Sequence, residues 1–384
     1  MHVIKTQSAL NDFCAAAAKS DFICVDTEFM RESTFYSILC LIQAATADAE
    51  VIIDPLVDGL DLTPFAALLM DRKIIKVLHA ARQDMEIFYQ ICGAVPTNIF
   101  DTQIAAMALG FGDSVGYGAL VKGRLDINVD KGARFTDWSR RPLSEKQLSY
   151  AMADVTHLRD LYPSMVEELT EKGRMDWVLE EMAPQMAEKL YTFEPENAWE
   201  RLKIRNPKKH YLAALKAAAA WRERQAKTKN IPRRRILKDD AMYDIAQQKP
   251  TDIKALARLR SIPRGFEKSS SAGPLVEAIA AAIDNAEDYA PKLPKVRHMP
   301  PNLGPTIEML KTLLRLRTEY VDIAPRMVAN NADIEKLAAF GDKAGIAALS
   351  GWRREIFGND ALKMLDGKIG LRLEGREVVA KDIG

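Results

Sequence analysis

The sequence predicts an α/β domain with a central sheet, followed by two all-helical domains. In about the first 110 residues, short apolar strand-like segments alternate with helix-like segments. Strand patterns fade from about residue 197 until a possible weak pair near the C-terminus, and a weak internal repeat relates two parts of the helical half. We therefore expect an α/β domain at 1–192, helical domains at 203–285 and 306–372, a Pro-rich linker at 286–305 and a tail at 373–384.

The first half contains the strand signals. FICVDTEF, ILCLIQAA and EVIIDP are short apolar segments with close connections, which is typical of an antiparallel meander. The helical stretch LTPFAALLM, the strand KIIKVLHA, a helix that begins near Arg82, a short strand at NIFDT and further helices follow. This mixed order predicts helices packed on a central sheet.

The second half has helical spacing in LAALKAAAAWRERQAK, AMYDIAQQ and PLVEAIAAAIDNA. IPRRRILKDDAMYDIA can be aligned with APRMVANNADIEKLA, which pairs Met242 with Ile334 and Ile245 with Leu337, an offset of 334 − 242 = 92 residues. Two unrelated amphipathic helices could give so short a match. We favour a duplicated helical domain.

The cysteines and the hydropathy of the sequence limit the classes of protein that it can belong to. The four cysteines form no CxxC or Cys/His cluster, so we expect reduced thiols in the core rather than disulfides or a zinc site. No apolar run approaches the roughly 20 residues that span a membrane. The first residues lack a basic segment followed by an apolar one, and we expect a cytoplasmic monomer without a secretion signal.

Charge is unevenly distributed along the chain. Residues 1–190 carry 18 Lys and Arg against 28 Asp and Glu, whereas 191–384 carry 36 against 25. Between 201 and 238 there are fourteen Lys and Arg and one acid, Glu223. This run predicts nucleic-acid binding, although a solvated helix face would look similar. The candidate binding residues for nucleic acid are Lys208, Lys209, Arg222, Arg224, Lys227, Lys229, Arg233, Arg234 and Arg235.

The second repeat is nearly neutral, with eight Lys and Arg against seven Asp and Glu in 306–357. Our hypothesis is that the first helical domain binds nucleic acid and that the second positions the nucleic acid or packs against the α/β domain. Lys131 and Arg141, close to the third motif described below, could contact phosphate or be ordinary surface cations.

Two carboxylates stand at the end of an otherwise apolar strand. Residues two apart on a strand point to the same side, so Asp26 and Glu28 should project together. Asp84 follows the strand KIIKVLHA by a few residues, at the opening of a helix, and Asp154 follows Tyr150 by one helical turn. Four carboxylates without His or Cys partners suit Mg²⁺ or Mn²⁺, and such clusters perform two-metal phosphoryl transfer. Tyr150 could hold or orient the attacking water.

Each signal taken alone has a simpler explanation. DxE pairs occur at many sheet edges, and YxxxD is common in helices. Asp101 in IFDTQ is better explained as a helix N-cap than as a metal ligand. His79 is better explained as a hydrogen-bonded histidine at a strand end, although it is close enough to the expected site to touch substrate.

The order of the motifs resembles a known family. VDTEF, LHAARQD and DWSRRPLSEKQLSYAMADVTHL resemble the three exonuclease motifs of the ribonuclease D family, within the DEDD 3′→5′ exonucleases. The third stretch is the most specific, because its DW, RPL and YxxxD elements are in register. The helical segments look like the HRDC domains of the same family, present here twice, and the resemblance covers most of the chain.

The resemblance implies an RNase H-like catalytic fold. It implies that Asp26, Glu28, Asp84 and Asp154 bind two divalent ions, Mg²⁺ or Mn²⁺, with Asp26 bridging both, and that Tyr150 positions the nucleophilic water. Ser149 stands where the other DEDD subgroup has a histidine, so the tyrosine subgroup fits.

The implied reaction is hydrolysis of the terminal phosphodiester of RNA, which releases nucleoside 5′-monophosphates from the 3′ end. Implied substrates include tRNA precursors with 3′ trailers. Two alternatives stay open: a DNA exonuclease of repair or proofreading type, which shares the same acids, and a non-catalytic RNA-binding protein. No motif identifies a contact to a 2′-hydroxyl, so the residues alone do not separate RNA from DNA.

Overall fold

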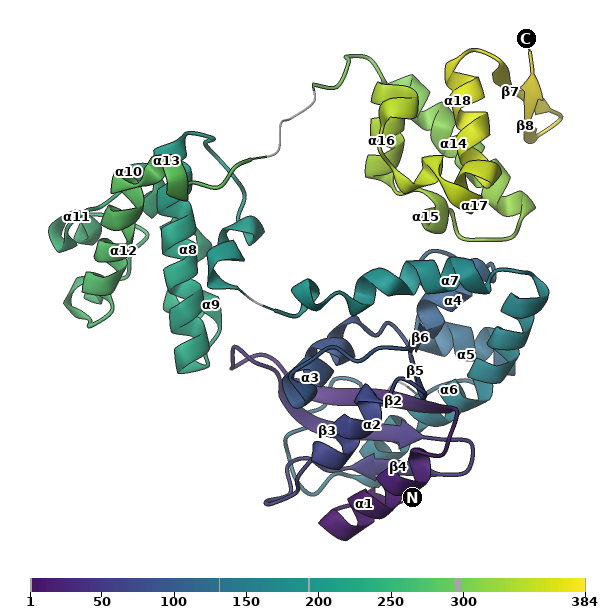
Figure 1. The fold of residues 1–384 in the computed structure, drawn as a ribbon, viewed down its shortest axis with the longest axis horizontal. Coiled ribbons are helices and arrows are strands. Elements are labelled where there is room, and N and C mark those ends of the chain that lie inside the picture. The colour runs from purple at the N-terminus through teal and green to yellow at the C-terminus, as the bar shows by residue number, and fades with distance from the viewer. Residues whose placement is uncertain (1, 131, 193, 294–297, 384) are drawn as a thin grey trace. The chain divides into compact units, whose positions relative to one another are not determined.

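The computed structural model describes residues 2–130, 132–192, 194–293 and 298–383 (Figure 1). These residues form two compact units. Unit 1 comprises the described residues of 1–28, 41–187 and 297–384, and unit 2 those of 29–40 and 188–296.

Unit 1 contains a six-stranded mixed sheet in the order β1-β4-β3-β2-β5-β6 (Figure 1). β3 and β4 are antiparallel, as the predicted meander requires, whereas β2, β5 and β6 are successively parallel. β1 pairs in parallel with β4, and the sequence did not predict it because two residues are too few to show alternation. The strands are β1 (Val3–Ile4), β2 (Phe22–Met30), β3 (Ile38–Ala45), β4 (Glu50–Ile53), β5 (Ile75–Leu78) and β6 (Ile99–Asp101).

Helices cover this sheet. α6 packs on β4 and β5, and β3 is buried without interruption from Cys40 to Ala45, as expected when both faces of a sheet are covered. Gly93 ends α3 in the left-handed conformation, with φ +69. The helices are α1 (Gln7–Ala17), α2 (Thr63–Met70), α3 (Arg82–Cys92), α4 (Thr102–Ala108), α5 (Tyr117–Leu125), α6 (Glu145–Glu171), α7 (Met175–Met182) and a 3₁₀ turn (Ala183–Met186).

The C-terminal part of unit 1 is helical and ends in a hairpin. Leu313, Leu337 and Phe357 are fully buried in its core, and Leu371 and Ala380 of the hairpin pack against that core. The hairpin confirms the weak strand pair seen in the sequence. The elements are α14 (Gly304–Tyr320), α15 (Pro325–Val328), α16 (Asn331–Phe340), 3₁₀ turns (Gly341–Lys343, Ala347–Leu349), α17 (Gly351–Arg353), a π turn (Arg354–Gly358), α18 (Asn359–Leu365), β7 (Ile369–Glu374) and β8 (Glu377–Asp382).

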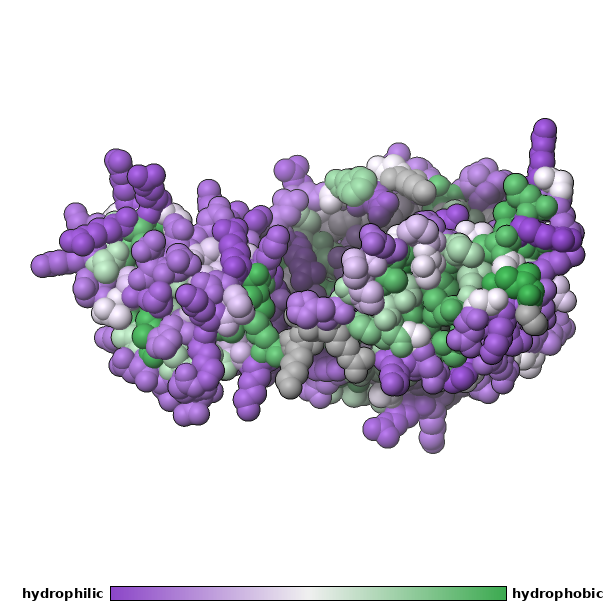
Figure 2. Space-filling model, turned by 90° about the horizontal axis from the view of Figure 1, so that it is seen from above, coloured by the Kyte–Doolittle hydropathy of each residue, from purple (hydrophilic) through white to green (hydrophobic). Residues whose placement is uncertain are grey.

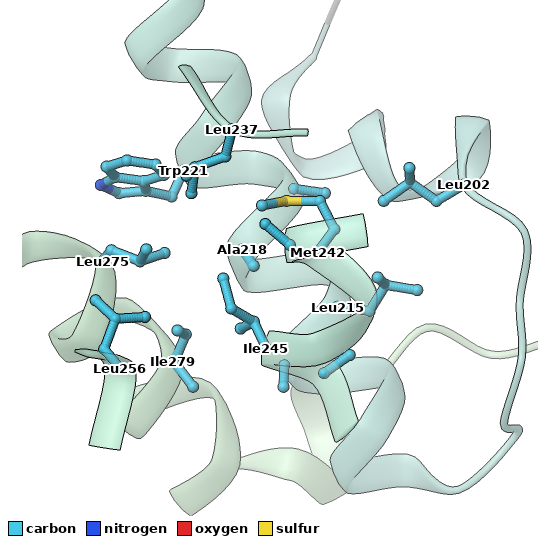
Figure 3. Packing of buried hydrophobic residues seen from close by; sticks show 14 of the residues in the cluster. Leu202, Leu215, Ala218, Trp221, Leu237, Met242, Ile245, Leu256, Leu275 and Ile279 are labelled. Atoms are coloured by element: carbon cyan, nitrogen blue, oxygen red, sulfur yellow. The ribbon is translucent and has the colours of Figure 1, made fainter. Parts of the chain in front are cut away.

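Unit 2 is built around α8, which packs against α10 and α12. Leu215, Ala218, Met242, Ile245 and Ile279 meet in its apolar core (Figure 3). Hydrophilic side chains cover most of the face of this unit seen in Figure 2. Its elements are 3₁₀ turns (Glu188–Leu190, Pro195–Arg201, Phe266–Lys268), α8 (Lys209–Lys229), α9 (Arg233–Ile236), α10 (Asp239–Gln248), α11 (Ile253–Ala257), α12 (Ala272–Asp284) and α13 (Ala286–Tyr289).

The two helical regions share a local order of elements. α9 and α10 begin at 233 and 239, and α15 and α16 begin at 325 and 331, so each pair is separated by the offset of the sequence repeat, as in 325 − 233 = 92. The paired core positions are also buried: Met242 and Ile245 in the first region, Ile334 and Leu337 in the second.

The structure agrees with the expectations for the cysteines and for membrane-spanning segments. All four cysteines are free, and Cys14, Cys24 and Cys40 are buried. No helix among the described residues combines the length and the apolar character needed to cross a membrane.

Candidate active site

The central strand β2 carries two of the predicted acids. β2 lies between β3 and β5, and its residues Cys24 and Val25 are buried immediately before the first acid. Asp26 and Glu28 are half-buried, and one carboxylate oxygen of each lies within 4.8 Å of an oxygen of the other and of Asp154. The strand thus holds the two carboxylates side by side, as their spacing predicts.

Helix α6 supplies Asp154 and Tyr150. A capping box of Ser144 and Gln147 fixes the start of α6, two turns before these residues. The Tyr150 hydroxyl donates to the Asp154 carboxylate one helical turn further on, and this hydrogen bond favours the charged form of the acid.

Tyr117 of α5 supports the same turn of α6. Its hydroxyl lies 2.8 Å from the carbonyl oxygens of both Ala153 and Asp154, and it can donate to either of them. The backbone that carries Asp154 is therefore held by a second tyrosine, which the sequence analysis did not identify.

Asp84 lies in the first turn of α3 and is buried. The Thr27 hydroxyl donates to its carboxylate at 2.5 Å, so the residue between Asp26 and Glu28 orients the third acid in the sequence. The charge of Asp84 contributes to the raised pKa of both Asp26 and Glu28. All four predicted acids therefore belong to one electrostatic cluster.

Burial is the main cause of the raised pKa of each of these four carboxyls. It raises the pKa of Glu28 to about 8, with further contributions from Asp154 and Asp84. The pKa of Asp154 rises to about 7 and that of Asp84 to about 6. The pKa of Asp26 lies well above its ordinary value, first through burial and then through the charges of Asp84, Asp154 and Glu28. Such carboxyls resist full ionisation without a compensating positive charge.

The donor set fits hard divalent cations. Within the part of the chain that the structure describes, no Lys or Arg forms an ion pair with Asp26, Glu28, Asp84 or Asp154. Clustered carboxylate oxygens without nitrogen or sulfur ligands are the donors that Mg²⁺ and Mn²⁺ prefer.

The simpler explanations for His79 and Asp101 are confirmed. His79 follows β5, and its Nδ1 lies 3.0 Å from the Thr102 hydroxyl. Asp101 caps α4 by accepting the Gln103 N–H at 2.9 Å, and it also accepts the N–H groups of Ala80 and Ala81. Asp101 is therefore occupied by backbone donors rather than available as a metal ligand.

Two of the candidate RNA-binding residues hold unit 2 together. Arg222 is buried, donates to the Leu237 carbonyl at 3.0 Å and forms an ion pair with Asp239 at 2.8 Å. Arg233 forms an ion pair with the buried Glu223. Since the Arg222 guanidinium is enclosed by its own domain, we leave Arg222 out of the RNA surface proposed below.

The other cations of the run lie at the surface of unit 2, and some have partners there. Lys209 pairs with Glu287, and Arg224 pairs with Glu196 at 2.8 Å. Among the candidate RNA-binding residues, Lys227 is half-buried, and the exposed ones are Lys208, Lys209, Arg224, Lys229, Arg234 and Arg235.

Arg141, one of the two cations near the third motif, is held in an ion pair. Arg141 donates to the two carboxylate oxygens of the buried Asp54, at 2.8 and 2.7 Å, and this pair fixes its loop. Lys131 lies outside the described residues.

Arg134 is a site neighbour that the sequence analysis missed. It is exposed, and its positive charge opposes the rise that burial causes in the pKa of Glu28, Asp154 and Tyr150. It lies in the irregular segment between α5 and α6, where neither periodicity nor a motif predicts which side chains face the acids.

Comparison with known proteins agrees with this geometry. Residues 1–170 match the model of a 3′-5′ exonuclease domain, and 212–269 match that of the HRDC domain. Ribonuclease D of Nitrobacter hamburgensis is 47% identical over 99% of both chains. The chain belongs to the ribonuclease D family. Ribonuclease D of Gluconacetobacter diazotrophicus is 42% identical, over 98% of this chain and 95% of the relative.

A solved structure supports the same family. The crystal structure of Escherichia coli RNase D, an exoribonuclease involved in structured RNA processing, matches with a TM-score of 0.76 and 28% identity, over 95% of this chain and 98% of that one. Family membership makes this chain an exoribonuclease, with a 3′-5′ exonuclease domain followed by a helical HRDC domain. The predicted family and reaction class are thus confirmed.

Proposed function

We propose that this ribonuclease D family member trims the 3′ ends of RNA, tRNA precursors with 3′ trailers among them, by metal-dependent hydrolysis that releases nucleoside 5′-monophosphates. The observation that carries this proposal is the cluster of Asp26, Glu28 and Asp154 with oxygens within 4.8 Å of one another, next to Asp84 and Tyr150. The cluster belongs to a 3′-5′ exonuclease domain, which supports a reaction at the 3′ end.

The proposed roles follow from the donor atoms. Asp26, Glu28, Asp84 and Asp154 would hold two divalent ions, Mg²⁺ or Mn²⁺. When bound, such ions activate water and stabilise the charge that develops on the leaving oxygen. The Tyr150 hydroxyl, which hydrogen-bonds Asp154, would orient the attacking water, and burial raises its pKa so that it stays protonated at neutral pH.

We further propose that the region from α14 to α18 is a second HRDC domain. The equal offsets of α9 and α15 and of α10 and α16, with buried partners at the paired positions, support a duplication. Lys208, Lys209, Arg224, Lys227, Lys229, Arg233, Arg234 and Arg235 of the first HRDC domain would give salt-dependent contacts to RNA phosphates. We expect a cytoplasmic monomer.

The proposal is tested with matched 5′-labelled RNA and DNA in Mg²⁺, Mn²⁺ or EDTA. We expect RNA to shorten stepwise from its 3′ end, and we expect EDTA and Asp26→Asn to stop the reaction. Asp48→Asn, which removes an exposed acid in the turn between β3 and β4, is the matched control and should leave the rate unchanged. Preferential degradation of DNA would favour the repair or proofreading alternative, and binding of RNA without shortening would favour the non-catalytic one.

A further inference from the structure

The segment between α5 and α6 presents two adjacent side chains that its own packing does not use. Phe135 is 91% exposed, an unusual position for so large an apolar ring. The Arg134 guanidinium lies over that ring, 5.2 Å from its centroid. Within the described residues, Arg134 forms no ion pair with an acid.

The residues on either side anchor this pair. Ala133 and Trp138 are buried, and the Trp138 ring lies 6.1 Å from the ring of Tyr150, next to the acids. Thr136 donates to the Ala133 carbonyl at 2.9 Å and accepts from Gln147 of α6 at 3.2 Å. Arg134 and Phe135 therefore project from a short bulge that is fixed at both ends beside the site.

Electrostatics also connects this bulge to the reaction. Arg134 is the cation whose charge acts on Glu28, Asp154 and Tyr150. A phosphodiester that approaches four carboxylates brings another negative charge, so a neighbouring guanidinium lowers the cost of its approach. The planar guanidinium fork suits two phosphate oxygens at once, and an exposed phenyl ring suits the flat face of any base.

We propose that Arg134 and Phe135 hold the 3′ end of the RNA at the active site, with Arg134 on a phosphate next to the scissile bond and Phe135 stacked on a base beside that phosphate. This inference rests on the proposed function. It adds two substrate-binding residues to the acids and Tyr150. Because every base can stack on a phenyl ring, this binding does not depend on which base is present.

The experiment measures kcat/KM on a 5′-labelled single-stranded RNA with the full-length protein. Phe135→Ala should lower kcat/KM about 5- to 100-fold, as for the loss of one stacked base, and Phe135→Trp should retain activity. Arg134→Ala should lower it by about 10- to 100-fold, as for the loss of a charged hydrogen bond, and Arg134→Lys should restore part of it.

Two control variants each remove an exposed side chain of the same kind, a cation or an aromatic ring. Arg140→Ala removes a cation whose side chain is 84% exposed in the same segment, and Tyr320→Ala removes an aromatic ring that is 89% exposed in α14. Both should leave kcat/KM within about twofold of the unsubstituted protein, since substitutions of exposed side chains that do not contact the substrate have little effect. Thermal unfolding of every variant checks that the fold is intact.

A second substrate separates stacking from a structural role. RNAs that are abasic at the last or the penultimate nucleotide should slow the unsubstituted protein, and at one of these positions Phe135→Ala should add no further loss. The inference would be overturned if the effects of Phe135→Ala and of the missing base on kcat/KM were fully additive at both positions. It would also be overturned if Phe135→Ala and Arg134→Ala lowered kcat/KM no more than the two controls do. If the unsubstituted protein does not shorten RNA at all, the proposed function itself fails.

Discussion

At the scale of single residues, the carboxyl cluster couples folding to pH. In the folded protein the pKa of Glu28 is about 8, that of Asp154 about 7 and that of Asp84 about 6, all above their ordinary values. The folded state therefore binds protons more tightly than the unfolded chain does. The resulting stabilisation is fully present below about pH 4 and is lost as pH rises from about 4 to about 8.

The first prediction concerns Asp26→Asn in EDTA. The pKa of Asp26 is raised by burial and by three neighbouring acids, so its charged form destabilises the metal-free protein. We expect the substitution to raise the melting temperature at pH 8. The decrease in melting temperature between pH 4 and pH 8 should also be smaller than in the unsubstituted protein. Asp48→Asn should change neither quantity. A lower melting temperature for Asp26→Asn at pH 8 would contradict the electrostatic account of this site.

The second prediction concerns the hydroxyl of Tyr150. Tyr150→Phe removes the donor to Asp154 but keeps the ring that lies 6.1 Å from Trp138. We expect kcat to fall by about 100-fold or more with KM changed little, because the hydroxyl acts on the attacking water rather than on RNA binding. Steady-state kinetics measures this, with Tyr320→Phe at the exposed end of α14 as the control. A raised KM at unchanged kcat would instead indicate a role in substrate binding.

At the scale of elements, a buried acid connects α8 to its neighbours. Glu223 of α8 is 1% exposed and pairs with Arg233 of α9 and with Arg201 at 3.4 Å. Removing one partner of a buried pair leaves the other without compensation, and the loss here is reduced because Arg233 is partly exposed. Glu223 is also the single acid of the basic run, and its pairing with these two arginines explains why an acid stands there.

The third prediction is that Glu223→Ala destabilises unit 2 by about 2–4 kcal/mol. Urea unfolding, followed by hydrogen exchange in peptides from α8 and α10, measures this loss. Glu277→Ala, at an exposed position of α12, is the control and should stay within about 0.5 kcal/mol. Equal stability of the two variants would show that the buried pair contributes nothing.

The limits of prediction are clearest in the elements themselves. Alternation along FICVDTEF was enough to place Asp26 and Glu28 on one side of a strand, and the spacing of Tyr150 and Asp154 was enough to place them on one helical face. Arg134 and Phe135 lie in a bulge whose path depends on tertiary packing, so no local pattern identified them. Arg222 has the same charge as its surface neighbours, and its burial depends on Asp239 of another helix.

At the scale of the whole of unit 1, one arginine connects the C-terminal helices to α7. Arg353 is buried, donates to the Met327 carbonyl at 2.8 Å and pairs with Glu180 at 2.6 Å and with Glu181. Beside it the rings of Trp177 and Trp352 stack, with centroids 4.3 Å apart. These contacts agree with the hypothesis that the nearly neutral second repeat packs against the catalytic domain.

The fourth prediction is that Arg353→Ala loosens the C-terminal helices. Glu180 and Glu181 would lose their common partner, and we expect a loss of about 2–4 kcal/mol in the protection of peptides from 304–365. Hydrogen exchange measures this, and Lys336→Ala, at an exposed position of α16, is the control. Unchanged protection in Arg353→Ala would mean that other contacts of these helices, such as the stacked tryptophans and the hydrogen bond from the Ala324 N–H to the Met107 carbonyl, hold them without Arg353.

Titration with Mn²⁺, followed by electron paramagnetic resonance, measures whether the buried carboxylates bind divalent metals. We predict that the unsubstituted protein binds two ions per chain at pH 8. Asp26→Asn should bind fewer ions or bind them more weakly, and Asp48→Asn should bind the same number as the unsubstituted protein. Binding should weaken as pH falls toward 6, because protons compete for carboxyls with raised pKa values. Equal Mn²⁺ binding by the unsubstituted protein and by Asp26→Asn would mean that these carboxylates do not form the metal site.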